Sequence, residues 1–172
     1  MMNHLDRREF LQLAAIACVG MIAAGSAAGA QKLDLTEKTV AELSTAMQKG
    51  ELSSETITNW YLARIKSLDP KLNSIIELNP DAISIARERD REQRLKNVKG
   101  PLHGIPFVIK DNIDTADKMK TTAGSLALVD APTPAKDAFI VERLREAGAV
   151  LLGKTNLSEW ANFRDNDSSS GW

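Results

Sequence analysis

Two short apolar runs, each bounded by turn residues, constrain the fold of this chain more than any other feature. Residues 105–109 (IPFVI) follow Gly104, and residues 149–152 (AVLL) lie between two further glycines. Runs of this length without polar alternation are typical of strands that are covered on both faces, as in parallel sheets. A helical pattern at residues 137–147 separates them, so the order is strand, helix, strand. We therefore expect a layered α/β fold with parallel strand pairing.

The segment before these runs is predicted to begin with a capped helix at residues 39–49. Thr39 and Glu42 have the spacing of a capping box, in which each side chain bonds the backbone of the other. Gly50 stands where a left-handed residue ends a helix. Both ends of this helix are therefore defined by the sequence.

Two more helices and a strand are expected before Gly100. The second helix covers residues 53–68 and should stop at Pro70. Residues 73–78 (NSIIEL) fit a short strand. The third helix should open with Asn79 as its N-cap and end near residue 96.

The C-terminal part alternates loops with short elements. Residues 115–134 are rich in loop-forming residues, and residues 157–163 are expected to be helical. The helix at 137–147 should turn Phe139, Ile140 and Leu144 toward the core.

Composition excludes several kinds of chemistry. The formal net charge is −1, with hydrophobic residues at 43% and charged residues at 26%, so a packed core is feasible and nothing directs the chain to nucleic acid. Cys18 is the only cysteine, and the histidines are His4 and His103. No disulfide framework, metal cluster or cofactor site is therefore expected.

Residues 1–30 fit an export signal. Arg7 and Arg8 precede Phe10 and Leu11, which resembles a twin-arginine leader, and a modest apolar stretch follows. That stretch is 12 residues long, whereas a membrane span takes about 20, so no stable membrane anchor is expected. Cleavage after Ala30 is predicted, which would place residues 31–172 in the periplasm or outside the cell through the twin-arginine export machinery.

Two other interpretations of the leader remain open. The segment could form an amphipathic or core helix of the folded protein. Alternatively, Cys18 could be lipid-modified after the preceding alanine-rich run.

Residues 148–155 (GAVLLGKT) match the phosphate-binding pattern G-x-x-x-x-G-K-[ST] letter for letter. That pattern needs a strand before the first glycine and an exposed loop whose amides surround phosphate. Here a helix precedes Gly148 and the intervening residues are apolar. We therefore interpret the segment as a strand, with Lys154 in solvent or paired locally.

Lys110 is the main candidate for catalysis. It ends the first apolar run, and desolvation at the mouth of a buried strand would favour its neutral form. A neutral lysine can act as a general base. A structural ion pair with Asp111 or Asp114 is the alternative that position alone leaves open.

Three stretches in order resemble the amidase signature family of Ser–Ser–Lys amide hydrolases. They are residues 100–114 (GPLHGIPFVIKDNID), 121–125 (TTAGS) and 148–161 (GAVLLGKTNLSEWA). The resemblance extends over residues 34–172. It implies a layered α/β/α fold with a mixed sheet, incomplete in this chain.

By this resemblance, Lys110 would be the base of a Ser–Ser–Lys triad. The loop with Thr122, Gly124 and Ser125 would line the substrate pocket. Both serines and the oxyanion loop are expected beyond Trp172, with residues 168–170 (SSS) belonging to the loop before them. The 172-residue chain alone should then be inactive.

The substrate class implied by the resemblance is a small amide or peptide amide, cleaved to a carboxylate and ammonia or an amine. Within the family, the alternative is part of an amidotransferase that acts on charged tRNA, and residues 1–30 argue against it. A non-catalytic interaction module is the alternative outside the family. A catalytic role for His103 is disfavoured, because a turn or hydrogen-bonding role before the strand is simpler.

Overall fold

The computed structural model describes residues 33–161, and its centre is a three-stranded mixed sheet. The strands are β1 (Ile75–Leu78), β2 (Pro106–Lys110) and β3 (Val150–Thr155), in the spatial order β1-β3-β2. β2 runs parallel to β3, and β1 runs antiparallel to it. The predicted α/β class with a mixed sheet is confirmed.

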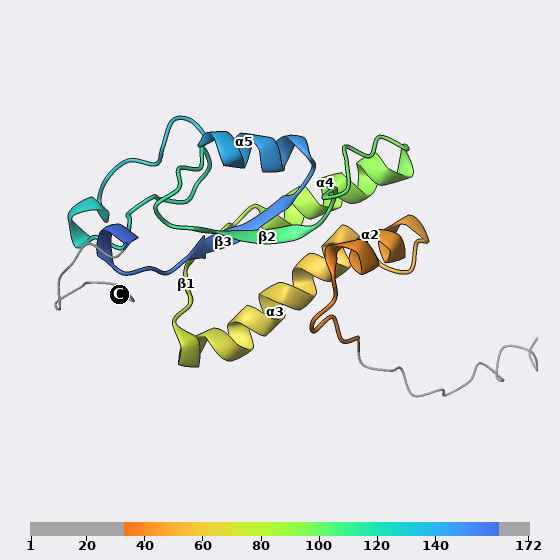
Figure 1. The fold of residues 1–172 in the computed structure, drawn as a ribbon, viewed down its shortest axis with the longest axis horizontal. Helices are drawn as coiled ribbons and strands as arrows, with labels where there is room; N and C mark the ends of the chain where they lie inside the picture. The colour runs from red at the N-terminus through yellow and green to blue at the C-terminus, as the bar shows by residue number, and fades with distance from the viewer. Residues whose placement is uncertain (1–32, 162–172) are drawn as a thin grey trace, which may run out of the picture. The chain divides into compact units, whose positions relative to one another are not determined.

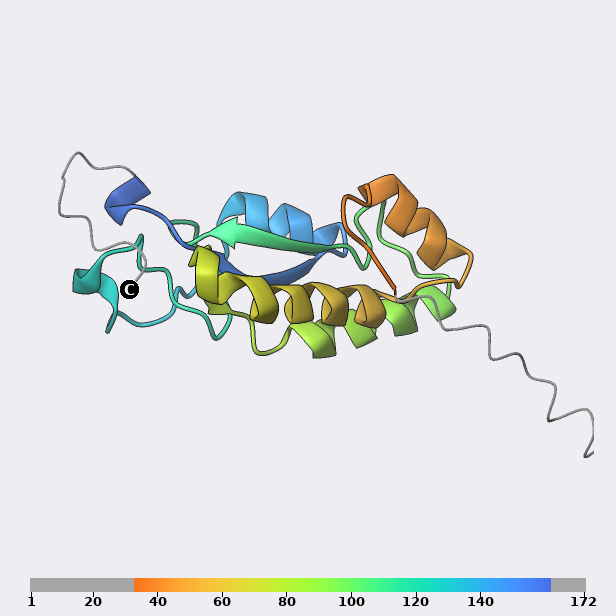
Figure 2. The ribbon, with the colours of Figure 1, turned by 90° about the horizontal axis from the view of Figure 1, so that it is seen from below.

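Helices cover both faces of this sheet (Figure 1). α5 (Phe139–Glu146) lies on one face, while α3 (Ser54–Leu72) and α4 (Ala82–Arg94) lie on the other. The view from below shows the same layers, with α2 (Val40–Gln48) beside one end of the sheet (Figure 2). Two short 3-10 turns, Leu126–Leu128 and Glu159–Ala161, complete the elements. No helix within residues 33–161 has the length and apolar character needed to cross a membrane.

The side chains of β3 alternate between two apolar clusters. Val150 and Leu152 pack against Ala82 and Ala86 of α4. Leu151, on the opposite face, belongs to a cluster that also contains Ile109, Met119 and Val141. Every residue of β3 up to Lys154 is buried, as predicted for a strand covered on both faces.

The ends of α2 follow the predicted pattern. The Thr39 N–H donates to Glu42 Oε2 at 2.8 Å, and the Glu42 N–H donates to Thr39 Oγ1 at 3.2 Å, which is the capping box. The Thr39 backbone bond, followed by the Lys38 ammonium, lowers the pKa of Glu42 to about 2. Gly50 has φ +74° and donates to Met47 O at 3.0 Å.

α3 does not stop before Pro70, so that prediction is wrong. The helix continues through Pro70 to Leu72. Pro70 cannot donate a backbone hydrogen bond, but only the last turn is affected. Beyond the helix, Asp69 Oδ1 accepts bonds from Ser74 N at 2.8 Å and Ile75 N at 3.1 Å, and hydrogen bonds from Ser74 lower the pKa of Asp69. The helix thus ends at Asn73, which is left-handed with φ 50°, and Asp69 holds the residues that follow it.

Asn79 is not the N-cap of α4, which corrects a second prediction. The N-cap is Asp81, and it makes no side-chain capping bond. Asn79 is buried and instead joins the start of α4 to the sheet, because its Nδ2 donates to Leu151 O at 2.8 Å and its Oδ1 accepts from Asp81 N at 2.9 Å.

The inward side of α5 also differs from the prediction. Phe139 is 73% exposed and Ile140 is 54% exposed, whereas Val141 is fully buried. The row that faces the sheet consists of residues spaced three apart, with Val141 followed by half-buried Leu144. Phe139 and Ile140, in the first turn, lie outside that row.

The predicted helix at residues 157–163 is wrong where the structure describes it. Only the 3-10 turn Glu159–Ala161 forms, and Trp160 within it has a left-handed conformation with φ 51°. The predicted leader at residues 1–30 and the serines at 168–170 lie outside the described residues.

Candidate active site

Lys110 is the last residue of β2 and is exposed in the described part of the chain. It pairs in register with Thr155 of β3. The expectation that the strand desolvates this lysine is not met among residues 33–161. Ile109 is buried in the cluster with Val141 of α5, whereas Val108 and Lys110 lie on the opposite face of β2 and are exposed there.

Asp111 turns inward directly after Lys110 and organises the loop that was predicted to line the pocket. Its Oδ2 accepts from Thr122 N at 3.1 Å and from Thr122 Oγ1 at 2.5 Å. Its backbone carbonyl accepts from Ala123 N at 3.0 Å. The loop containing Thr122 is therefore fixed at the end of β2 that carries Lys110, and the structure brings these predicted site residues together.

Gly124 and Ser125 hold the same loop from its other side. Gly124 has φ +67°, and a Cβ there would lie 2.8 Å from Leu157 O, so the position requires glycine. Ser125 is buried, and its hydroxyl lies 2.5 Å from Glu159 Oε1, to which it donates. The loop is thus held between the end of β2 and the segment that follows β3.

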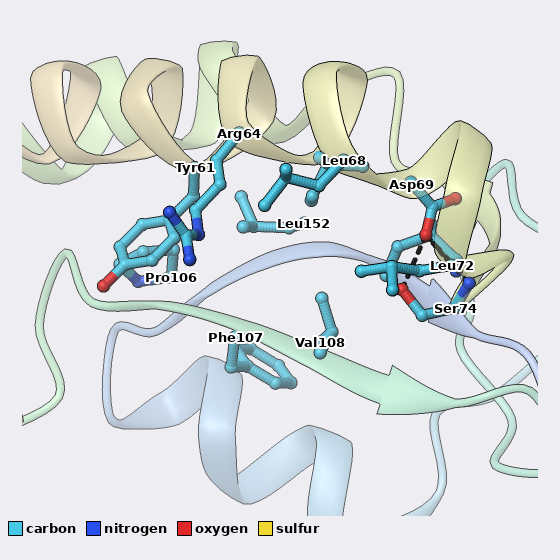
Figure 3. Close-up of a pocket in the computed structure, with 12 residues that line it drawn as sticks. Tyr61, Arg64, Leu68, Asp69, Leu72, Ser74, Pro106, Phe107, Val108 and Leu152 are labelled. Atoms are coloured by element: carbon cyan, nitrogen blue, oxygen red, sulfur yellow. Dashed lines mark hydrogen bonds between the residues drawn. The ribbon is translucent and has the colours of Figure 1, made fainter. Parts of the chain in front are cut away.

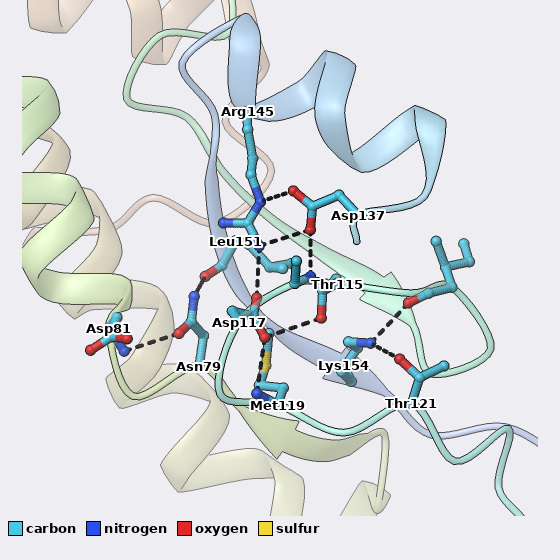
Figure 4. A network of polar contacts seen from close by, with 12 residues as sticks. Asn79, Asp81, Thr115, Asp117, Met119, Thr121, Asp137, Arg145, Leu151 and Lys154 are labelled. Carbon is cyan, nitrogen blue, oxygen red and sulfur yellow. Dashed lines mark hydrogen bonds and ion pairs between the residues drawn. The ribbon is translucent and has the colours of Figure 1, made fainter. Parts of the chain in front are cut away.

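Lys154 is buried, which corrects the expectation that it is in solvent or paired locally. Its relative exposure is 0%. Its Nζ donates to Ile113 O at 2.8 Å and to Thr121 Oγ1 at 2.9 Å (Figure 4). Burial lowers the pKa of this ammonium, and Asp111, whose Oδ1 lies 3.9 Å from Nζ, opposes that shift.

A polar network beside Lys154 ties the loop after β2 to α5 (Figure 4). Arg145 Nη2 lies 2.7 Å from Asp117 Oδ2, and its Nε lies 2.9 Å from Asp137 Oδ2. Asp117 Oδ1 accepts from Thr115 Oγ1 at 3.1 Å and from Met119 N at 2.9 Å. This loop is therefore held by defined bonds rather than by apolar packing alone.

His103 has the turn and hydrogen-bonding role that the sequence favoured. It is buried, and its Nε2 lies 2.9 Å from Arg89 O. A carbonyl only accepts, so Nε2 carries the proton and Nδ1 accepts from Lys99 N at 3.4 Å. The phosphate-binding interpretation of residues 148–155 is likewise excluded, because Val150–Thr155 is the central strand β3.

An apolar groove of about 410 Å³ lies between α3 and β2, and the sequence did not predict it. Figure 3 shows Tyr61, Leu68 and Leu72 from α3 on one side, with Phe107 and Val108 from β2 on the other. The signal in the sequence was the apolar run of β2, which was expected to form a fully covered strand.

The sequence of the chain matches a known family over most of its length. The family model described as Amidase matches residues 56–171. With a three-layer α/β fold and the three ordered motifs around Lys110, this chain belongs to the amidase family.

Individual relatives agree with this assignment. The chain is 49% identical, over 83% of its length, to a Schizosaccharomyces pombe protein described as a putative amidase, of which it covers 24%. It is 42% identical, over 77% of its length, to one chain of the glutamyl-tRNA(Gln) amidotransferase of Halorhodospira halophila, of which it covers 27%. The chain thus spans about a quarter of the length of these curated relatives.

Solved structures give the same result. The native peptide amidase from Stenotrophomonas maltophilia shares 59% identity with a TM-score of 0.73, over 77% of this chain and 27% of that chain. An amidase family protein from Bacillus anthracis shares 45% identity with a TM-score of 0.73, over 80% of this chain and 27% of that chain.

Proposed function

We propose that the protein containing this chain hydrolyses carbon–nitrogen amide bonds and that Lys110 is its catalytic base. The observation that supports this proposal best is the position of Lys110. It ends a strand parallel to β3, and Asp111 fixes the Thr122 loop directly beside it. Side chains at the carboxyl ends of parallel strands meet at one edge of the sheet, where α/β proteins bind their ligands.

The proposed chemistry is a Ser–Ser–Lys mechanism. Lys110 takes a proton, through an intermediate serine, from a nucleophilic serine that attacks the amide carbonyl. Backbone amides of a glycine-rich loop stabilise the oxyanion. The tetrahedral intermediate then collapses: the carbon–nitrogen bond breaks, ammonia or an amine leaves with the proton that Lys110 had accepted, and an acyl-enzyme remains. Water hydrolyses the acyl-enzyme to a carboxylate and frees the serine. We place both serines in a Gly/Ser-rich segment after residue 172.

The substrate class that we favour is a peptide amide or a small amide. The likeness to a peptide amidase at 59% identity supports it, against 42% for the amidotransferase chain. An exported location, from the leader with Arg7, Arg8 and Phe10 and cleavage after Ala30, would fit an enzyme acting outside the cytoplasm.

Replacing both arginines, Arg7 and Arg8, by lysine should then leave an uncleaved precursor in the cytoplasm. Normal processing of that variant would contradict the twin-arginine assignment.

The decisive experiment replaces Lys110 in the full-length protein. Lys110→Ala should lower hydrolysis of a C-terminally amidated dipeptide by at least about 10²–10⁴-fold, because a positioned general base contributes that much. Lys118→Ala is the matched control, since Lys118 is exposed and pairs with Asp81 at 2.7 Å on the surface. Equal losses in both variants, with circular dichroism unchanged, would contradict the role of Lys110.

A further inference from the structure

We propose that Lys154 is a positioning residue, whose buried ammonium fixes the turn after β2 and thereby holds the backbone of Lys110 in place. This inference rests on the proposed function of Lys110. The lysine belongs to β3 and pairs in register with Ile109, the residue before Lys110. Partners in register share a face of the sheet, and neighbours along a strand point to opposite faces. Lys154 and Lys110 therefore lie on opposite faces, and Lys154 acts through the backbone.

The path from Lys154 to Lys110 consists of two hydrogen bonds through one residue. Lys154 Nζ donates to Ile113 O at 2.8 Å, and Ile113 N donates to Lys110 O at 3.0 Å. The backbone of Ile113 is thus held on both sides. The turn from Lys110 to Ile113 therefore fixes the Lys110 carbonyl, and Lys154 of the central strand β3 holds the other end of this turn at Ile113.

The same ammonium also closes the loop that begins at this turn. Its second bond goes to Thr121 Oγ1 at 2.9 Å, so one side chain joins Ile113 to Thr121 (Figure 4). The next residue, Thr122, bonds Asp111, which faces Lys154 through its other carboxylate oxygen. Lys154 and Asp111 therefore hold both ends of the loop that starts beside Lys110.

Burial of this ammonium carries a cost that simple packing would not. A charged group removed from water loses solvation, and here that loss lowers the pKa of Lys154, while Asp111, Asp117 and further carboxylates oppose it. A methionine of similar length would fill the same volume without desolvating a charge. Unlike methionine, the lysine donates hydrogen bonds in defined directions. Both of its bonds, to Ile113 O and to Thr121 Oγ1, go to the loop after β2.

The test measures kcat and KM separately in the full-length protein, with an amidated dipeptide as substrate. Active sites are counted by irreversible labelling with a serine-directed phosphonate. Lys154→Met should lower kcat per labelled site by about 10–100-fold and change KM little. This is the range for residues that orient a functional group without contacting the substrate. Lys118→Met, in the same loop but exposed, should leave kcat unchanged.

Thr121→Val tests the second bond of Lys154, the one that closes the loop, without changing the buried charge. It removes one of the two bonds to Lys154, so kcat should fall by a smaller factor. The double variant Lys154→Met/Thr121→Val should be no slower than Lys154→Met alone, because both changes break one interaction. If Lys154→Met does not fold, the single variant Thr121→Val still tests the proposal, because it keeps Lys154.

Other results would overturn the inference. A lower melting temperature with unchanged kcat per labelled site, in Lys154→Met or in Thr121→Val, would make Lys154 a purely structural residue while amide hydrolysis stands. Additive losses in the double variant would show that the two residues act independently. If the wild-type protein hydrolyses no amide, the proposed function fails first, and the inference falls with it.

Discussion

β2 and β3 are neighbouring parallel strands with similar apolar sequences, yet they lie in different environments. Residues 150–154 of β3 are all buried, whereas in β2 only Ile109 is buried and Val108 is 40% exposed. β3 is the central strand and has helices on both faces. β2 borders the groove beside α3 and is paired on one side only within residues 33–161. Position in the sheet, and not the apolar content of the run, decides the burial.

The same difference separates the two lysines at the ends of these strands. Lys154 is fully buried and bonded at Nζ, while Lys110 is exposed. The local sequence pattern predicted the reverse, with desolvation at Lys110 and solvent around Lys154. An exposed lysine in a proposed catalytic position fits a site whose remaining walls come from other parts of the protein.

The largest expected effect concerns the 172-residue chain expressed alone. It should hydrolyse no amide, and it should self-associate, because the edge of β2 offers unpaired backbone groups beside an apolar groove within residues 33–161. Size-exclusion chromatography and ammonia release measure both properties. Val108→Lys, which places a charge in the exposed apolar groove, should reduce the association.

The opposite result would remove the contrast between the two strands. A monomeric 172-residue chain that unfolds cooperatively and releases ammonia from a simple amide would show that β2 needs no further cover. It would also place the nucleophile within this chain.

Side-chain truncation in β3 should have the next largest effect. Leu151 is 1% exposed between the sheet and α5, so Leu151→Ala in the full-length protein should lower the free energy of unfolding by about 2–5 kcal/mol. Leu95→Ala is the control, because Leu95 is 73% exposed and its truncation should cost less than about 0.5 kcal/mol. Urea denaturation measures both, and equal costs would contradict the central position of β3.

A smaller cost is expected at Gly153, where β1 and β3 approach closely. A Cβ at this position would come too near to Glu77 O, at 2.4 Å, so Gly153→Ala should destabilise the protein by about 1–3 kcal/mol as the strands separate. At Gly100 the nearest atom to an added Cβ is 3.9 Å away, and Gly100→Ala serves as the control. Equal melting temperatures for the two variants would show that β1 can move away from β3 without destabilising the protein.

The smallest effect is the pH dependence that Lys154 imparts. Burial lowers the pKa of Lys154 below its value of about 10.4 in the unfolded chain. Between these two values the unfolded chain binds more protons at this site, so stability should rise with pH. Relative to Lys154→Met, the free energy of unfolding should therefore increase as the pH rises through the lowered pKa toward about 10.4, by at most about 1.4 kcal/mol per pH unit. A difference that stays flat or falls would contradict the lowered pKa.

Local patterns were the predictable part of this fold. The capping box of Thr39 and Glu42 and the strand predicted at residues 73–78, which is observed at 75–78, depend on neighbours in sequence or on simple periodicity. The errors depend on contacts far along the chain. Asn79 bonds Leu151 across 72 residues, and Lys154 bonds Ile113 across 41. No local pattern encodes these partners.

The candidate site divides in the same way. The motif singled out Lys110 and the loop containing Thr122, which Asp111 joins in the structure, while the roles of these residues in the site stay predictions. It gave no indication that Asp111 and Lys154 join them. A polar residue next to an apolar run is compatible with solvent or burial, and only the packed structure distinguishes the two.

The strand order has a consequence for how this part of the protein folds during synthesis. β3 is the last of the three strands in sequence but the middle one in space, and the ladders of β1 and β2 in this sheet are both formed with it. Neither early strand can complete its hydrogen bonds until residues 150–155 have left the ribosome. Such long-range pairing is slow and leaves apolar strands unprotected while the chain grows. During that interval α3 and α4 are available to cover part of the nascent apolar surface.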